Sequence, residues 1–170
     1  MSDLTLHEAS VPVFVATLGN MKAWLAKAAD REAMLMTAAL APDMAPFPRQ
    51  YQMASDTAKN ALARLTGTDA PSMPDTETSF AELSDRCDRT IAWLRDIGAA
   101  ALAGAADREV EIRFPNGMGY RWTGRTFLVG YALPNFYFHA TTAYAILRHN
   151  GVTLGKPDFL QHLGPPNLKA

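Results

Sequence analysis

The stretch that decides the fold is LPNFYFHATTAYAILRHNG, which covers residues 133–151. Its aromatic and aliphatic side chains fall on nearly every side of a helix that turns by about 100° per residue, a pattern typical of a helix buried among others. The pattern extends back to Gly124 and predicts one helix over residues 124–150, kinked at Pro134 and capped by Gly151. A helix buried nearly all round needs neighbours on several sides, and this favours a helical bundle.

One face of this helix is apolar at both ends and polar in the middle. It carries Leu128, Tyr131, Asn135, His139, Thr142 and Ile146. Asn135 and His139 stand four residues apart, so their side chains point at the same spot. Because an unpaired buried polar group costs about 1–3 kcal/mol, something inside the bundle must bond to both. Two interpretations are open: an internal hydrogen-bonded network, or a pocket that takes a metal or a ligand.

Three further helices are predicted from apolar stripes with steps of three and four residues. The first begins between Leu6 and Ser10 and ends near Asp30, the second covers Phe47–Leu65, and the third runs from Phe80 to near Gly98. The proline-rich stretch 41–48 is expected to form an ordered loop, because each proline removes a donor and restricts the residue before it.

A change of period marks a β-hairpin before the last helix. Apolar residues alternate on both sides of the turn signal Asn116-Gly117, which predicts a hairpin over Glu109–Thr123 that lies against the helices. The tail, residues 152–170, is expected to be irregular. The predicted fold class is all-α: a single domain over residues 1–170, built as a four-helix bundle with a small β-hairpin before the last long helix.

The composition of the 170-residue chain argues against several classes of partner. The formal net charge is −1 and there is no basic stripe, so no nucleic-acid partner is expected. No apolar run is long enough to span a bilayer and no signal-peptide pattern is seen, so no membrane partner is expected. The single cysteine, Cys87, fits a reducing compartment, and the protein is expected to be cytoplasmic. The 29 alanines favour helices without indicating any chemistry.

Several residues beside the Asn135–His139 pair are further candidates. Gln50, Gln52 and Thr142 are candidates for lining a pocket, although helix geometry favours capping or surface roles for the two glutamines. Cys87 lies on an apolar stripe and is interpreted as a small buried hydrophobe, with a thiolate paired to His139 as the alternative. The acidic run 75–77 is interpreted as a solvated patch.

Three segments of the chain carry a resemblance to a known family. They are Ala41-Pro42-Asp43-Met44, Asp75-Thr76-Glu77 with Phe80-Ala81-Glu82, and Leu133 to His139 continued by Ala143 to Gly151. In these segments the chain resembles an uncharacterised bacterial branch, a domain of unknown function, of the DinB/YfiT-like superfamily, over about residues 4–160. The resemblance implies an up-down-down-up four-helix bundle with a long connection between the second and third helices. It also implies a homodimer.

The resemblance further implies a metal site, because better-known members of the superfamily hold zinc or nickel with three histidines. Carried over residue by residue, His139 matches the second histidine of the last helix, Asn135 stands in place of the first, and the second helix has no histidine. Asn and Gln are poor zinc ligands compared with His. The expectation is a degenerate divalent-metal site at His139, with no cofactor tightly bound.

Two functions follow as hypotheses. The first is a small-molecule or thiol-linked enzyme site at the bundle centre, in which His139 serves as metal ligand or general base and Asn135 orients the substrate. By resemblance alone, such an enzyme is a metal-dependent hydrolase or a thiol-dependent transferase. The second is a non-enzymatic, dimeric helical protein in which both residues are structural. A single inward-facing histidine favours the second hypothesis or a pocket without metal.

Overall fold

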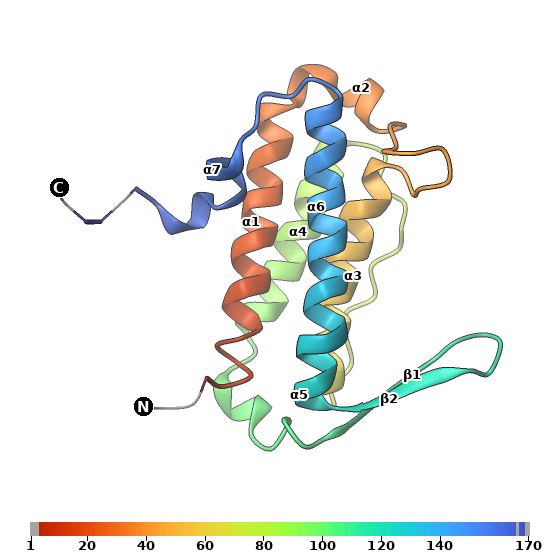
Figure 1. Cartoon of the computed structure of the whole chain (residues 1–170), viewed down its shortest axis with the longest axis vertical. Helices are drawn as coiled ribbons and strands as arrows, with labels where there is room; N and C mark the ends of the chain where they lie inside the picture. Colours follow the sequence, from red (N-terminus) through yellow and green to blue (C-terminus); the bar gives the residue numbers. More distant parts are fainter. Residues whose placement is uncertain (1–3, 166, 169–170) are drawn as a thin grey trace.

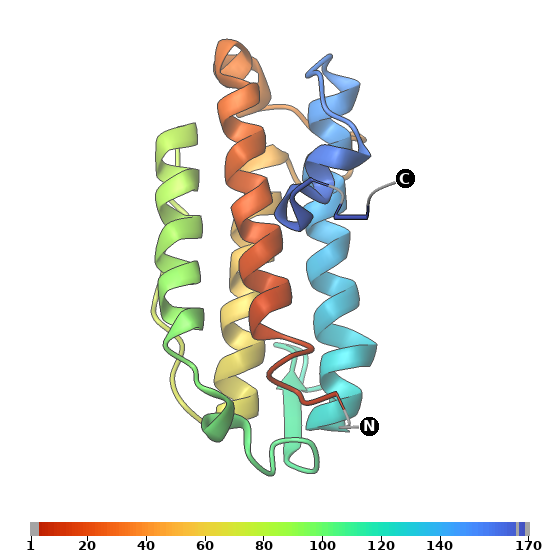
Figure 2. The same ribbon diagram turned by 90° about the vertical axis from the view of Figure 1, so that its left-hand side faces the viewer.

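The computed structural model describes residues 4–165 and 167–168, and four long helices form the bundle in this part of the chain (Figure 1). They are α1 (Val11–Lys27), α3 (Phe47–Thr66), α4 (Phe80–Arg95) and α6 (Leu133–His149). Helices α1 and α6 run one way along the bundle and α3 and α4 run the other, while residues 67–79 return along its length (Figures 1 and 2). The predicted fold class and the up-down-down-up order are confirmed.

The last helix is one continuous rod made of three segments. A short α5 (Gly124–Phe127) leads into a π-helical turn (Leu128–Ala132), and α6 follows directly. In a regular helix the ring of Pro134 would clash with the carbonyl four residues earlier, and proline has no N–H to donate. The wide turn just before Pro134 accommodates it, so the predicted irregularity takes the form of a π-turn. Gly151, with a φ of +81°, follows the helix as predicted.

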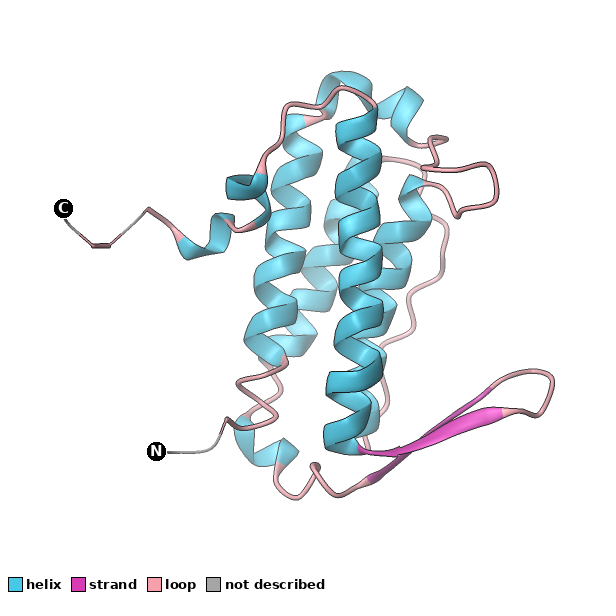
Figure 3. Ribbon diagram, viewed as in Figure 1, coloured by secondary structure: helices cyan, strands magenta, loops and turns pink. Residues whose placement is uncertain are grey.

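The predicted hairpin is present as β1 (Glu109–Arg113) and β2 (Gly119–Thr123), with Val110 opposite Trp122. Its base packs on the last helix, since the Trp122 ring lies 5.4 Å from that of Tyr131 and 5.8 Å from that of Phe127. Its tip points away from the bundle and leaves Met118 exposed (Figure 3). The expectation that the hairpin lies against the helices is therefore wrong for the tip, because the strands run outward from the end of the bundle.

A close backbone approach holds the base of the hairpin in place. The Gly124 N–H donates to the Arg108 carbonyl at 2.8 Å. A Cβ atom at Gly124 would lie 1.9 Å from the Ala105 carbonyl oxygen, which is far inside any contact distance. Glycine is therefore required where the hairpin joins the last helix, and this junction sets the position of the hairpin relative to α6.

The remaining segments are short helices and turns. They are a 3-10 turn (Ala29–Arg31), α2 (Glu32–Leu35), a 3-10 turn (Ala99–Leu102), α7 (Lys156–Phe159) and a 3-10 turn (Gln161–Leu163). The tail, expected to be irregular, contains only the last two of these short segments among its described residues, and side chains of α1 hold it. Trp24 Nε1 donates to the Asp158 carbonyl at 3.1 Å, and Asn20 Nδ2 donates to the Phe159 carbonyl at 2.8 Å. Because these bonds join residues far apart in the chain, no repeating pattern in the tail sequence predicts them.

The hydrophobic core fills the space between all four helices. Phe14 of α1 meets Phe136 of α6 edge to face at 4.8 Å between ring centroids, and both are fully buried. Tyr51 of α3 is also fully buried, and its hydroxyl donates to the Met21 carbonyl at 2.8 Å. Helix α3 therefore contributes to the core and packs against both α4 and α6. None of the helices in the described part of the chain is both long and apolar enough to cross a bilayer.

Candidate functional site

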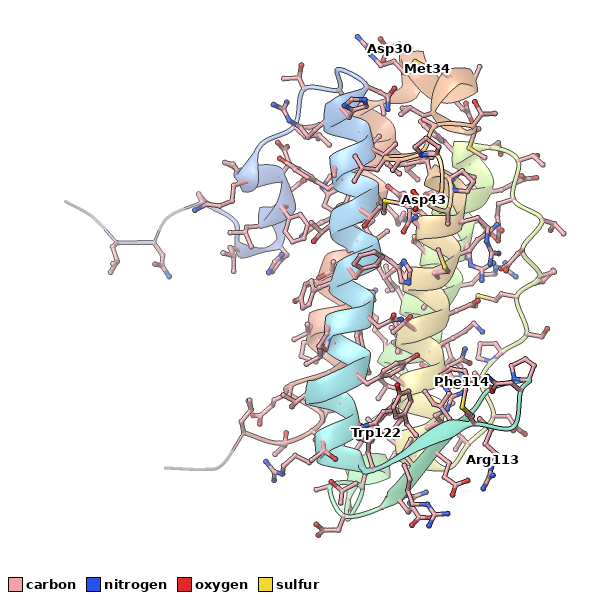
Figure 4. All side chains as sticks on the ribbon, turned by 45° about the vertical axis from the view of Figure 1, so that its right-hand side comes forward. Asp30, Met34, Asp43, Arg113, Phe114 and Trp122 are labelled. Atoms are coloured by element: carbon pink, nitrogen blue, oxygen red, sulfur yellow. The ribbon has the colours of Figure 1, made fainter. Side chains whose placement is uncertain are left out.

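A cleft of about 270 Å³ lies between α3 and α6, with Ile112 of the hairpin in its wall. Its polar lining consists of Asp56, Thr57, Asn60, Arg64, Asn135 and His139, and its other lining residues are Met53, Ala61, Ile112, Phe127, Tyr131 and Ala132. Figure 4 looks onto this face, where α3 and α6 run side by side with Trp122 and Phe114 of the hairpin near one end and Asp43 toward the other. The polar middle of α6 thus meets α3 at an open cleft.

Two hydrogen bonds between α3 and α6 position the candidate pair. Asn135 Nδ2 donates to Thr57 Oγ1 at 2.8 Å, and His139 Nδ1 lies 2.9 Å from Gln50 Oε1. The two helices run in opposite directions, so a step toward the C-terminus of α6 is a step toward the N-terminus of α3. Asn135 and His139 both lie on the α3-facing side of α6 and line the same cleft.

The hydrogen bonds of Gln50 assign the tautomer of His139. Gln50 Nε2 donates to the Ala45 carbonyl at 2.7 Å, so the Gln50 amide oxygen is the atom that faces the histidine. An amide oxygen only accepts, and His139 Nδ1 must therefore carry the proton. Within the described residues no fully buried side-chain nitrogen or oxygen lacks a partner, and Nε2 makes no bond, so Nε2 is accessible to solvent.

The electrostatic surroundings keep His139 neutral. Its side chain is buried among the helices, and burial lowers the pKa of the imidazole below its ordinary value of 6.5 because the charged ring would lose its hydration. The nearby positive charge of Arg49 lowers the pKa of His139 further. At neutral pH the ring is thus an uncharged acceptor at Nε2 and a donor at Nδ1.

The structure separates the other predicted site residues. Gln50 and Gln52 are both buried, so the favoured surface roles are wrong, because partners on α6 and in the connecting segment 67–79 draw these side chains inward. Gln50 joins His139, whereas Gln52 accepts from Arg49 at 2.8 Å and donates to Glu77 at 2.8 Å on the α4 side. Thr142 is buried too, but its hydroxyl donates to the Phe138 carbonyl of its own helix at 2.7 Å. None of Gln50, Gln52 and Thr142 is among the residues that line the cleft, and Gln50 contributes only through its contact with His139.

A second polar cluster, between α3 and α4, is centred on Arg86, whose side chain is fully buried. Its guanidinium binds the Ser55 hydroxyl at 2.6 Å, the Pro74 carbonyl at 3.2 Å, and the carboxylates of Asp56 at 2.7 Å, Glu77 at 2.8 Å and Asp75 at 3.1 Å. All three nitrogens are engaged. We call this set of residues, with Gln52, the Arg86 cluster, and it fastens the connecting segment 67–79 to both helices.

The Arg86 cluster corrects one interpretation of the sequence. The run 75–77 is a solvated patch only in part, since Asp75 and Thr76 are exposed whereas the Glu77 side chain is only 6% exposed. Burial by itself would raise the pKa of Glu77, but hydrogen bonds from Arg86 and Gln52 outweigh it and hold the pKa below its ordinary value of 4.5. One signal pointed to the cluster: Arg86 follows Leu83 by three residues and precedes Thr90 by four, which places an arginine on the inward face of its helix.

The cleft does not fit the divalent metal that the superfamily resemblance implies. A zinc site needs three or more good nitrogen, oxygen or sulfur ligands. Among residues 4–165 and 167–168, no three His, Cys, Asp or Glu side chains gather closely enough to hold a metal. The Asp56 carboxylate beside the cleft is already bound by Arg86 at 2.7 Å and by Lys59 at 3.1 Å. His139 is thus left without companion ligands.

Cys87 is a buried packing residue, as predicted. Its thiol is fully buried on the inner face of α4, and burial raises the pKa of the thiol to about 12. A thiol with that pKa stays protonated at neutral pH and is a poor nucleophile. The alternative, a Cys87 thiolate paired with His139, is therefore not supported.

The up-down-down-up bundle, with a hairpin before its last helix and a cleft between α3 and α6, defines a DinB-like protein. The sequence matches the family described as Domain of unknown function (DUF1993) over residues 6–160, and the chain belongs to this family. It is similar to a DinB family member protein from Shewanella denitrificans, known from a crystal structure, with 40% sequence identity and a TM-score of 0.84 over 97% of this chain and 95% of that chain. No curated protein matches the sequence. The predicted resemblance is confirmed.

Proposed function

We propose that the cleft between α3 and α6 binds a small molecule and that His139 is its hydrogen-bond and proton acceptor. The observation that carries the proposal is the chain of hydrogen bonds from the Ala45 carbonyl through Gln50 to His139 Nδ1. This chain occupies one ring nitrogen with a bond to the protein and keeps the lone pair on Nε2 for a partner in the cleft.

The chemistry that suits this arrangement is general base catalysis without a metal. Nε2 takes a proton from an O–H, N–H or S–H group of the bound molecule, and the imidazolium that forms keeps its bond to the Gln50 oxygen. Burial and Arg49 both disfavour the charged ring, so the proton is held briefly and returned. Asn135, tied to Thr57 through its amide nitrogen, has an amide oxygen that makes no bond among the described residues and orients the same molecule.

The test compares two histidines of the same helix. His139→Gln removes the proposed acceptor, whereas His149→Gln changes an exposed histidine at the end of α6. Small polar molecules, low-molecular-weight thiols among them, are screened for stabilisation of the wild-type protein by thermal shift. We expect His139→Gln to lose the response to each hit and His149→Gln to keep it. Hits that stabilise both variants equally would contradict the proposal.

A second proposal is a homodimer formed through the outer face of the last helix. No Asp, Glu, Lys or Arg occurs from Thr126 to Leu147, while the neighbouring Tyr137 and Phe138 are 37% and 55% exposed. In a two-fold symmetric contact the same patch meets itself, so an uncharged apolar face is self-complementary. Apolar side chains exposed in this way favour association.

Light scattering on two charge-adding variants tests the homodimer. Phe138→Glu places like charges opposite each other across the two-fold axis and is expected to give monomers. The control is Tyr120→Glu on the hairpin, where the aromatic ring is 58% exposed and thus comparably accessible. Tyr120→Glu is expected to stay dimeric. A wild-type monomer would overturn the homodimer, and a dimer that persists in Phe138→Glu would overturn this face as its interface.

We also propose a cytoplasmic location. The one cysteine of the chain is a free, buried thiol, which suits a reducing compartment. Immunodetection in fractionated cells tests this, and recovery outside the cytoplasmic fraction would contradict it.

A further inference from the structure

We infer that the molecule bound in the α3/α6 cleft is a small extended anion, whose acidic group pairs with Arg64 and whose far end donates a hydrogen bond to His139. The inference rests on the proposed function, because it names the class of ligand for the same cleft. Three observations carry it: the charge of Arg64, the balance of charge around Asp56, and the distance between Arg64 and His139 along the cleft.

Arg64 is a cation without a carboxylate partner. It lines the cleft, and no ion pair of this residue occurs in the described part of the chain. Its one hydrogen bond goes from Nη1 to the Asn60 carbonyl at 3.2 Å, four residues earlier in its own helix. A guanidinium has five N–H donors in a planar fork, and the remaining donors suit a carboxylate or a phosphate.

The other charged residue in the cleft wall does not cancel Arg64. Asp56 lines the cleft, but its carboxylate is neutralised by Arg86 at 2.7 Å and by Lys59 at 3.1 Å. His139 is uncharged at neutral pH because burial and Arg49 disfavour the imidazolium. The net charge presented to a ligand is therefore positive and located at Arg64, which favours an anion and disfavours a cation.

The positions of Arg64 and His139 define the shape of the ligand. The bond between Asn135 and Thr57 places these two residues at the same level of the bundle. Arg64 lies seven residues beyond Thr57, about 10 Å toward the hairpin, and His139 lies four residues beyond Asn135, about 6 Å the other way. Side chains lean toward the N-terminus of their own helix, so the two groups lean toward each other along the cleft.

The wall between these two ends is mixed, since Asp56, Thr57, Asn60 and Asn135 alternate with apolar lining residues. Tyr131 and Met53 line it, together with Ile112 from the hairpin. A compact anion such as inorganic phosphate reaches Arg64 but not His139. A molecule with an acidic group at one end, an apolar or amide body, and a hydroxyl, amino or thiol group at the other end reaches both.

A structural role for Arg64 is the competing explanation. Arg64 lies in the last turn of α3, where a cation stabilises the negative end of the helix dipole. Arg95 also lies in the last turn of its helix, α4, and does not line the cleft. Arg95→Gln is thus the matched control for Arg64→Gln: the dipole role predicts similar behaviour of both variants, whereas the ligand role predicts that only Arg64→Gln alters binding.

The experiment is a titration followed by two-dimensional NMR of the isotope-labelled full chain. The probes are straight-chain ω-hydroxycarboxylates of increasing length and the corresponding neutral ω-hydroxyamides. We expect carboxylates of intermediate length to shift the resonances of cleft residues most, and the amides to bind more weakly. In Arg64→Gln the affinity for the carboxylates is expected to fall about tenfold or more, and in Arg95→Gln to stay unchanged.

The outcomes separate the two proposals. If amides bind the cleft as tightly as carboxylates, or if carboxylates still bind Arg64→Gln with wild-type affinity, the ligand is not an anion held by Arg64. The proposal that the cleft binds a small molecule would still stand. If affinity rises steadily with chain length, the ligand does not contact Arg64 at one end and His139 at the other. If neither series perturbs the cleft residues at millimolar concentration, both the anion and the proposed small-molecule function are wrong.

Discussion

The two sides of α3 use polar residues in opposite ways. On the α4 side, every nitrogen of the buried Arg86 guanidinium is bonded to the protein, and the cluster joins two helices to the connecting segment. On the α6 side, His139 and Asn135 each make one bond to α3 and keep one polar atom free. The difference shows that burial of a polar residue does not by itself indicate function. What distinguishes the cleft is hydrogen-bonding capacity left over in a place that a ligand can reach.

The largest effect is expected on the α4 side. Arg86→Met leaves Glu77 buried without its main partner, and the free energy of unfolding is expected to fall by about 3 kcal/mol, measured by urea denaturation. The control Arg89→Met changes an arginine on the same helix whose side chain is 48% exposed, and its effect is expected to stay below about 0.5 kcal/mol. Equal losses for the two variants would contradict a structural role for the Arg86 cluster.

Acid should reduce the stability that the Arg86 cluster contributes to the fold. Because hydrogen bonds hold the folded-state pKa of Glu77 below its ordinary value of 4.5, its carboxylate stabilises the fold above that value. This contribution is lost as the pH falls from about 4.5 through the lower folded-state pKa. Glu77→Gln is therefore expected to be less stable than wild type at neutral pH and to show a shallower loss in acid.

Denaturation midpoints from neutral pH to about pH 3 check this dependence. Asp85→Asn, at a side chain that is 67% exposed on α4, is the control and should keep the wild-type slope. A wild-type slope in Glu77→Gln would show that other carboxylates govern the acid response.

A smaller effect is expected on the α6 side. Asn135→Ala removes one hydrogen bond to Thr57 at a partly exposed position, so the free energy of unfolding should fall by about 1 kcal/mol or less. The same variant should also lower the affinity of the cleft for any small molecule that binds there. A loss as large as that of Arg86→Met would assign Asn135 to the stability of the fold instead.

The smallest effect concerns metal. Because the cleft lacks companion ligands for His139, dialysis against a chelator should leave the melting temperature unchanged, and protein purified without an affinity tag should contain no stoichiometric zinc or nickel by elemental analysis. Stoichiometric metal that is lost in His139→Ala would contradict this reading of the cleft.

Much of the fold could be predicted from the sequence because its signals are local. Stripes with helical spacing, the turn at Asn116-Gly117, and the glycines after α3 and α6 report on neighbours within a few residues. The shared orientation of Asn135 and His139 is of the same kind, since it depends only on the geometry of one helix. The packing of the tail on α1 depends on residues far apart in the sequence, and no repeating pattern in the tail predicts it.

The partners of the site could not be predicted, because they depend on how helices are aligned with each other. Viewed along α3 alone, Gln50 lies at the flank of the apolar stripe, and only the alignment with α6 brings it to His139. Arg86 is buried because carboxylates from α3 and from the connection before α4 meet around it. The pattern within a single helix cannot predict either of these contacts between segments.

The central claim is that His139 is a neutral base with its proton on Nδ1 and a free Nε2. Nuclear magnetic resonance of the ¹³C- and ¹⁵N-labelled imidazole measures the tautomer and the pKa of this ring directly. We predict the Nδ1–H tautomer with a pKa below 6.5, and a mixture of tautomers in Gln50→Leu, where the partner of Nδ1 is removed. A proton on Nε2 in the wild-type protein, or a pKa above 6.5, would contradict the account.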